Sequence, residues 1–146
     1  MSGAAPSVDL EGTCACGAVT LAVRGRVFSM FMCSCEDCQR ATGTGHSTAA
    51  MVRGVDVTVS GPVKGFDFTA DSGATFTRHF CAECGTPLFG RSSRAPQMMM
   101  LPVGFFGRTS DWFRPGQLLF ARSHRAWDEV AEDVARHESY RPGGTP

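Results

Sequence analysis

The sequence predicts a mainly β protein, and three observations lead to this prediction. Apolar residues recur at every second position through much of the chain, as they do in strands with one buried face. Seventeen glycines and eight prolines separate these runs, which suits tight turns. Hydrophobic residues make up 42% of the 146 residues, which is enough for a core. This length fits one domain, so we expect residues 1–146 to form a single domain.

The expected strands follow from the alternation of apolar residues along the chain. Val19, Leu21 and Val23 alternate with smaller or polar residues, and the same pattern returns several times. A near-continuous apolar run from Met98 to Val103 is consistent with a strand buried on both faces. We expect its methionines to fill gaps in the core. The predicted strands lie near residues 19–23, 28–32, 55–59, 66–68, 76–80, 98–103 and 118–121.

Helical structure is expected in two places. The clearer one runs from Trp127 to about Arg136, because Trp127, Val130, Ala131 and Val134 would share one face of a helix. A short helical turn is expected at residues 36–41. The tail 141–146 is expected to be loose.

Charge and composition exclude some classes of partner. Lysine plus arginine equals aspartate plus glutamate at 14 each, so the clustered positive charge that nucleic-acid binding requires is not expected. No apolar run approaches the roughly 20 residues of a membrane helix. The first ten residues have neither a basic start nor an apolar segment, so we expect no secretory signal and a cytoplasmic location.

Seven cysteines in three clusters are the most informative chemical feature of the sequence. Their odd number leaves one unpaired in any complete set of disulfides, and cysteines one residue apart rarely reach disulfide geometry. An iron–sulfur cluster is a further alternative, but no four-cysteine run supports it. Metal binding, with zinc as the expected ion, explains the pattern better. The clusters are Cys14 with Cys16, Cys33 with Cys35 and Cys38, and Cys81 with Cys84.

The two cysteine pairs together offer four thiolates, which is the ligand set of a closed structural zinc site. Gly17 and Gly85 each follow a pair directly, and glycine lets the backbone turn tightly around a metal. That the two pairs share one zinc is an inference from their spacing. Such a site would join distant parts of the chain and stabilise the fold.

The central cluster offers only three thiolates from one short segment, and three interpretations remain open. With water or substrate in the fourth position, the site would be an open and catalytic zinc site. A histidine from elsewhere would close it and make it structural. Without metal, the three thiols would act as nucleophiles or redox groups. The candidates for a fourth ligand are His46, His79, His124 and His137.

Three motifs in order resemble the glutathione-dependent formaldehyde-activating enzyme family, which also includes centromere protein V. They are GTCACGAV at residues 12–19, CSCEDCQRATG at 33–43 and FCAECGTPLF at 80–89, and residues 117–127 resemble the family's closing strand and following tryptophan. The resemblance implies an all-β fold called a β-tent, held together by zinc. It also implies that the four paired cysteines hold the structural zinc and that Cys33, Cys35 and Cys38 hold a catalytic one.

The resemblance further implies a carbon–sulfur lyase that acts on S-(hydroxymethyl)glutathione, the adduct of formaldehyde and glutathione. Glutathione is anionic, so cationic side chains are expected near its site, and Gln39 stands where many relatives carry arginine. The alternative function is a zinc-stapled binding module without catalysis. The candidate cations are Arg40, Arg53, Arg78 and Arg91.

Overall fold

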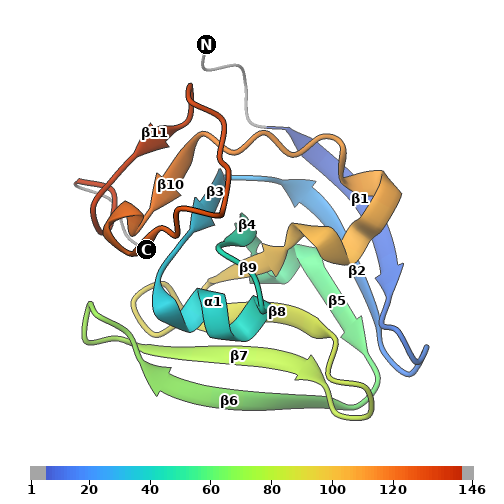
Figure 1. Ribbon diagram of the computed structural model, residues 1–146. Helices are drawn as coiled ribbons and strands as arrows, with labels where there is room; N and C mark the ends of the chain where they lie inside the picture. The colour runs from blue at the N-terminus through green and yellow to red at the C-terminus, as the bar shows by residue number, and fades with distance from the viewer. Residues whose placement is uncertain (1–5, 143–146) are drawn as a thin grey trace. The chain divides into compact units, whose positions relative to one another are not determined.

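A computed structural model describes residues 6–142, which fall into two compact units (Figure 1). Among the described residues, unit 1 comprises 6–29 and 50–112, and unit 2 comprises 30–49 and 113–142. The mainly β prediction is confirmed, because residues 36–42 form the one α-helix within the described part of the chain. That the chain forms a single domain stays a prediction.

Unit 1 contains most of the strands and two 3₁₀ helices. Strand β4 (Ser47–Arg53) begins in unit 2 and ends in unit 1. The other elements of unit 1 are β1 (Ser7–Thr13), β2 (Thr20–Arg26), η1 (Gly54–Asp56), β5 (Val57–Ser60), β6 (Val63–Thr69), β7 (Thr75–Cys81), β8 (Pro87–Ser92), β9 (Met98–Pro102) and η2 (Val103–Ser110).

A three-stranded antiparallel sheet forms one part of unit 1, with β2 between β1 and β5. Leu21 pairs with Val59 and is fully buried, and Val23 is buried beside it. Because successive side chains of a strand point to opposite faces, this period of two buries one face and leaves the other exposed. The predicted strands near 19–23 and 55–59 are therefore confirmed, although Val55 itself lies in η1 and is 86% exposed.

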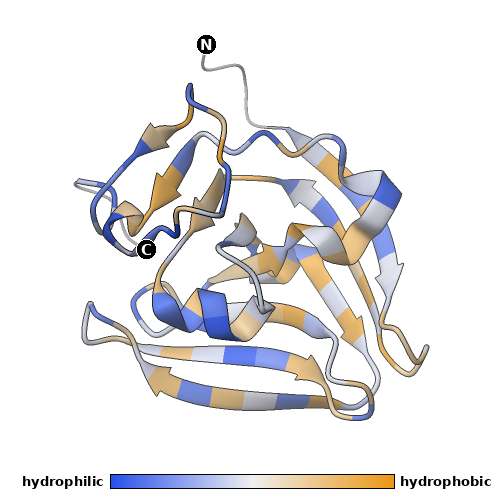
Figure 2. Cartoon of the chain, in the orientation of Figure 1, coloured by the Kyte–Doolittle hydropathy of each residue, from blue (hydrophilic) through white to orange (hydrophobic). Residues whose placement is uncertain are grey.

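Strands β9, β8, β7 and β6 neighbour one another in that order within unit 1. Hydrophobic and hydrophilic residues alternate along β6 and β7 (Figure 2). Phe68 and Phe76 pair across these two strands with ring centroids 5.5 Å apart. Leu88 and Met99 are buried, so the expected core role of the methionine run is borne out at Met99.

Unit 2 carries the central cysteine cluster on a strand followed by a helix. Its elements are β3 (Ser29–Cys33), α1 (Glu36–Thr42), β10 (Gln117–Leu119), η3 (Ala121–Ser123) and β11 (Ala135–Arg136). Strand β10 lies parallel to both β3 and β11, and Leu119 pairs with Cys33. The predicted helical turn after Cys35 is confirmed and extends to Thr42.

The predicted helix from Trp127 to about Arg136 is wrong. The segment forms turns and ends in β11, and Trp127 is 67% exposed. A short helix is stable mainly when tertiary packing covers its apolar face. Here Val130 and Val134 are half-buried and Ala131 is exposed, so no apolar stripe is covered.

Sequence reasoning also missed strands β1, β4 and β8 and the 3₁₀ helix η2. Of the predicted loose tail, Arg141 and Pro142 are exposed, and residues 143–146 lie outside the described residues. Across residues 6–142, none of the helices has the length and apolar character that crossing a membrane would require.

Candidate metal centres

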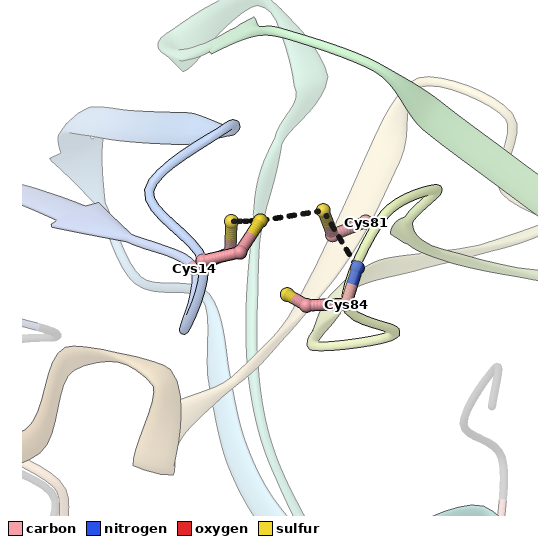
Figure 3. A group of neighbouring side chains, drawn as sticks. Cys14, Cys81 and Cys84 are labelled. Carbon is pink, nitrogen blue, oxygen red and sulfur yellow. Dashed lines mark hydrogen bonds between the residues drawn. The ribbon is translucent and has the colours of Figure 1, made fainter.

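The structure brings the two cysteine pairs of unit 1 together. Cys14 and Cys16 lie in the turn between β1 and β2. Cys81 is the last residue of β7, and Cys84 lies in the turn that leads to β8. Figure 3 shows the sulfurs of Cys14, Cys81 and Cys84 turned toward a common centre. All four sulfurs lie within 4.8 Å of one another.

The sulfur distances fit a tetrahedral metal ion. The Sγ atoms of Cys14 and Cys16 are 3.6 Å apart, and those of Cys16 and Cys81 are 3.8 Å apart. Zinc bonds to sulfur at about 2.3 Å, which places two sulfurs of a tetrahedron about 3.8 Å apart. The four-thiolate donor set and these distances therefore suit zinc.

Backbone N–H groups surround the sulfurs of this group. The amide of Val19 donates to Cys14 Sγ at 3.2 Å, and the amides of Glu83 and Cys84 donate to Cys81 Sγ at 3.4 and 3.5 Å. Such donors offset the negative charge that four thiolates concentrate around a divalent ion.

Two tight turns aim these amides at the sulfurs. Gly17 and Gly85 have φ values of 82° and 78°, a backbone conformation that other residues rarely adopt. Their amides donate to the carbonyls of Cys14 and Cys81, respectively. The two turns also meet directly, because the amide of Ala15 donates to the hydroxyl of Thr86 at 3.1 Å.

The thiols of this group differ in acidity. Hydrogen bonds from the Thr86 side chain and backbone lower the pKa of Cys84 to about 5. The pKa of Cys16 is raised to about 12: a backbone hydrogen bond with Ala18 acts to lower it, but desolvation and the neighbouring thiols outweigh this. The group thus offers a thiolate at Cys84 at neutral pH, and binding of a divalent cation there would displace the proton of Cys16.

The central cluster lies within unit 2, where the end of β3 meets the start of α1. Cys33 ends the strand, Cys35 is the N-cap of the helix, and Cys38 lies in the helix. The amide of Cys38 donates to Cys35 Sγ at 3.3 Å. The three sulfurs lie within 4.8 Å of one another, with Cys33 buried and the other two half-buried.

The three central thiols share protons unequally. Hydrogen bonds with Cys33 and then Cys38 lower the pKa of Cys35 to about 3. In contrast, hydrogen bonds with Cys35 and then Cys38 raise the pKa of Cys33. A thiolate is the form that binds a metal and attacks an electrophile. The cluster therefore presents a thiolate ligand at Cys35, one of its two half-buried members.

No histidine joins this cluster among residues 6–142. His79 belongs to unit 1 and stacks on Phe89 with ring centroids 4.2 Å apart, and burial lowers its pKa. His46 and His124 instead approach the carboxylate of Asp128. The three sulfurs are thus an incomplete tetrahedral set within the described part of the chain.

The side chain of Gln39, on α1, holds residues 33–35 (the cysteine loop) in place, a role that sequence reasoning did not foresee. Its Nε2 donates to the carbonyl of Ser34 at 2.8 Å and to the carbonyl of Ser123 at 3.0 Å. Ser34 lies between two of the cysteines, is fully buried, and donates its own amide to the carbonyl of Leu119. The loop is therefore fixed both from α1 and from the end of β10.

The chain after β10 is bent sharply to reach Gln39. Phe120 has a φ of 56°, the one positive value found at a described residue other than glycine. Its ring is buried against Tyr140, with centroids 4.9 Å apart and nearly perpendicular planes. This packing stabilises an otherwise unfavourable backbone and precedes η3, whose last carbonyl accepts from Gln39.

Of the four candidate cations, Arg40 alone lies in unit 2 with the central cluster. It belongs to α1, is 71% exposed and lies 3.9 Å from Asp37. The other three contact groups within unit 1: Arg53 pairs with Asp56, Arg78 lies over the rings of Phe66 and Phe68, and Arg91 donates to the carbonyl of Pro96.

Comparisons with known proteins identify the family of the chain. The family model described as "Glutathione-dependent formaldehyde-activating enzyme" matches residues 9–123. Proteins of Aspergillus flavus and Aspergillus oryzae, each described as a putative glutathione-dependent formaldehyde-activating enzyme, are 31% identical over 86 residues. That match covers 59% of this chain and 44% of each relative, so the chain spans less than half of their length.

A solved structure supports the fold. A Rhodobacter sphaeroides protein is similar with a TM-score of 0.54 and 23% identity, over 68% of this chain and 89% of that one. The resemblance inferred from the three cysteine motifs is confirmed by the family match, which contains all seven cysteines. The chain belongs to the glutathione-dependent formaldehyde-activating enzyme family.

Proposed function

We propose that this protein is a zinc-dependent carbon–sulfur lyase that acts on a small thiol–aldehyde adduct such as S-(hydroxymethyl)glutathione. The observation that carries the proposal is the incomplete set of three sulfurs at Cys33, Cys35 and Cys38. A catalytic zinc site keeps one position for water or substrate, whereas a structural site uses four protein ligands.

The two cysteine groups take different roles in this proposal. Cys14, Cys16, Cys81 and Cys84 hold a structural zinc that joins two turns 65 residues apart in sequence. The central three cysteines hold a second zinc with an open position. Bound there, zinc would supply Lewis acidity toward an oxygen and affinity for a thiolate sulfur.

The reaction itself needs only a bond change and a proton transfer. In the lyase direction the carbon–sulfur bond of the adduct breaks, the hydroxyl oxygen loses its proton and becomes a carbonyl, and the sulfur leaves as a thiol. The reverse reaction adds the thiol to the aldehyde. No electrons are gained or lost, so the chain requires no redox partner.

Glutathione is the proposed thiol because the family and both fungal relatives carry it in their descriptions. Its carboxylates need cationic partners, and Arg40 is the candidate on the same helix as Cys38. Glutathione is abundant in reducing compartments, where free thiols persist, so we place the protein in the cytoplasm.

The proposal is tested by the rate at which the adduct exchanges with free glutathione and formaldehyde. The adduct also forms without a catalyst, so the assay measures exchange at equilibrium by NMR. We expect the zinc-loaded protein to raise the exchange rate without changing the equilibrium ratio. Cys35→Ser should return the rate to the uncatalysed value.

A matched control separates catalysis from folding. Cys35→Ser is expected to keep the folded state of the wild type, while Cys84→Ser disrupts unit 1 and lowers stability. If the wild type loaded with two zincs leaves the exchange rate unchanged, the lyase proposal fails and a zinc-stapled binding module becomes the better interpretation.

A further inference from the structure

A buried cluster of two histidines and one carboxylate lies in unit 2, outside the cysteine groups. Nδ1 of His46 is 2.6 Å from Oδ2 of Asp128, and Nε2 of His124 is 3.5 Å from the same oxygen. The side chain of Asp128 is 10% exposed. A carboxylate that is this deeply buried must be hydrogen-bonded or paired to be stable, and here the Nδ1–H group of His46 supplies the hydrogen bond.

The cluster is built by close packing as well as by polar contact. Gly45 precedes His46, and a Cβ atom placed at Gly45 would overlap the carboxylate of Asp128. Only a residue without a side chain at this position leaves room for the carboxylate. The backbone amide of Asp128 also donates to the carbonyl of Arg125, which fixes the turn that presents it.

The contact with Asp128 sets the tautomer of His46. A short hydrogen bond to a carboxylate requires a proton on Nδ1, so Nε2 of the neutral ring carries a free lone pair. Within the described residues Nε2 of His46 has no hydrogen-bond partner. This atom is not fully buried, so solvent reaches it. Such an arrangement is that of a side chain poised to accept or give a proton.

Both histidines adjoin residues that contact helix α1 of the central cluster. Ser47, next to His46, hydrogen-bonds the thiol of Cys38. Ser123, next to His124, accepts the hydrogen bond from Gln39. Each histidine is therefore one residue away in the chain from a contact with helix α1.

We propose that His46 is the proton-transfer residue of the lyase reaction and that Asp128 is a positioning residue that fixes its tautomer; this inference rests on the proposed function. In the direction of addition, Nε2 takes the proton from the thiol while the sulfur bonds to the carbonyl carbon. The π electrons of the carbonyl move to its oxygen, which then takes the proton from Nε2. In the lyase direction the same steps run in reverse, and Nδ1 keeps its proton throughout.

The deciding variant is His46→Asn. The amide nitrogen of asparagine occupies the place of Nδ1 and still donates to Asp128, but nothing replaces Nε2. A role confined to bracing Asp128 would survive this change, and a proton-transfer role would not. We expect the turnover rate of adduct exchange to fall about 100-fold, with KM changed less than about threefold. His137→Gln changes a histidine of unit 2 whose side chain has no hydrogen-bond or ion-pair partner among the described residues, and it should leave both unchanged.

Two further readouts test the parts of the inference separately. Added imidazole should restore part of the turnover of His46→Ala. Nitrogen-15 NMR of the wild type should show His46 protonated at Nδ1, and Gly45→Ala, which displaces Asp128, should abolish that preference.

The outcomes are distinguishable. If His46→Asn retains turnover while the wild type is active, the proton-transfer role is refuted and the lyase proposal stands. If His46→Asn loses zinc, His46 acts in metal binding and the inference is also wrong. If the zinc-loaded wild type does not accelerate exchange, the proposed function itself fails, and the role of His46 falls with it.

Discussion

Gln39 provides the sharpest test of how the central cysteine cluster is held in place. Its side-chain amide donates to the carbonyls of Ser34 and Ser123, and Ser34 lies between Cys33 and Cys35. Gln39→Met keeps the length and volume of the side chain but removes both donors. The substitution therefore isolates the two hydrogen bonds.

The expected magnitude follows from these contacts. Each hydrogen bond contributes about 1 kcal/mol net, so the loss of both costs about 2 kcal/mol. Ser34 is fully buried, and leaving its carbonyl without a donor adds a further penalty of about 1 kcal/mol or more. Metal binding must then order the cysteine loop without these hydrogen bonds. If this ordering costs about 2 kcal/mol of binding free energy, the metal affinity of the central cluster drops roughly 30-fold.

The assay measures the affinity of the central three-cysteine cluster for zinc. A chromophoric chelator competes with the protein for this ion, which three protein ligands hold more weakly than four. Cobalt loading gives a second readout, because thiolate ligation produces charge-transfer bands that report on the three sulfurs. Arg40→Met is the matched control: Arg40 neighbours Gln39, is 71% exposed and makes only a 3.9 Å contact with Asp37. If Gln39→Met and Arg40→Met bind metal equally well, Gln39 does not position the cysteine loop and the reasoning is refuted.

Two further predictions concern the four-cysteine group of unit 1. Gly85→Ala should destabilise the zinc-loaded protein by about 1–2 kcal/mol in urea unfolding, because φ is 78° there. Gly104→Ala meets nothing within 4 Å and has no positive φ, so equal losses for the two variants would contradict this reasoning. Zinc uptake by the metal-free protein at pH 7 should release protons, since Cys16, with a pKa of about 12, is protonated there and Cys84, with a pKa of about 5, is not. Affinity should consequently fall as pH falls, and a titration showing no pH dependence between 6 and 8 would be inconsistent with thiol ligands.

Sequence reasoning succeeded where the signal is local. Alternating residues such as Leu21 and Val23 predict strands because a strand with one buried face has a period of two. Each cysteine pair was also recognisable, since a tight turn that carries two thiols and a glycine is a local pattern. Strand β1 carries the same alternation at Val8 and Leu10, so the missed strand could have been found.

The errors and omissions arise where tertiary packing decides. The apolar positions of 127–136 have helical spacing, but a helix there would need a buried face, and Trp127 is exposed. The contact of His46 with Asp128 joins residues 82 apart in sequence, which no periodicity can reveal. The double hydrogen bond of Gln39 likewise depends on the bend at Phe120, a conformation that phenylalanine rarely adopts.

The number of zinc ions per chain tests the central claim most directly. Elemental analysis of protein purified without chelator should give two zincs for the wild type and one for Cys35→Ser, with the folded state retained. These values would mean that the four-cysteine group and the three-cysteine group bind metal independently. One zinc in both proteins would contradict the account, because the central three cysteines would then hold no metal.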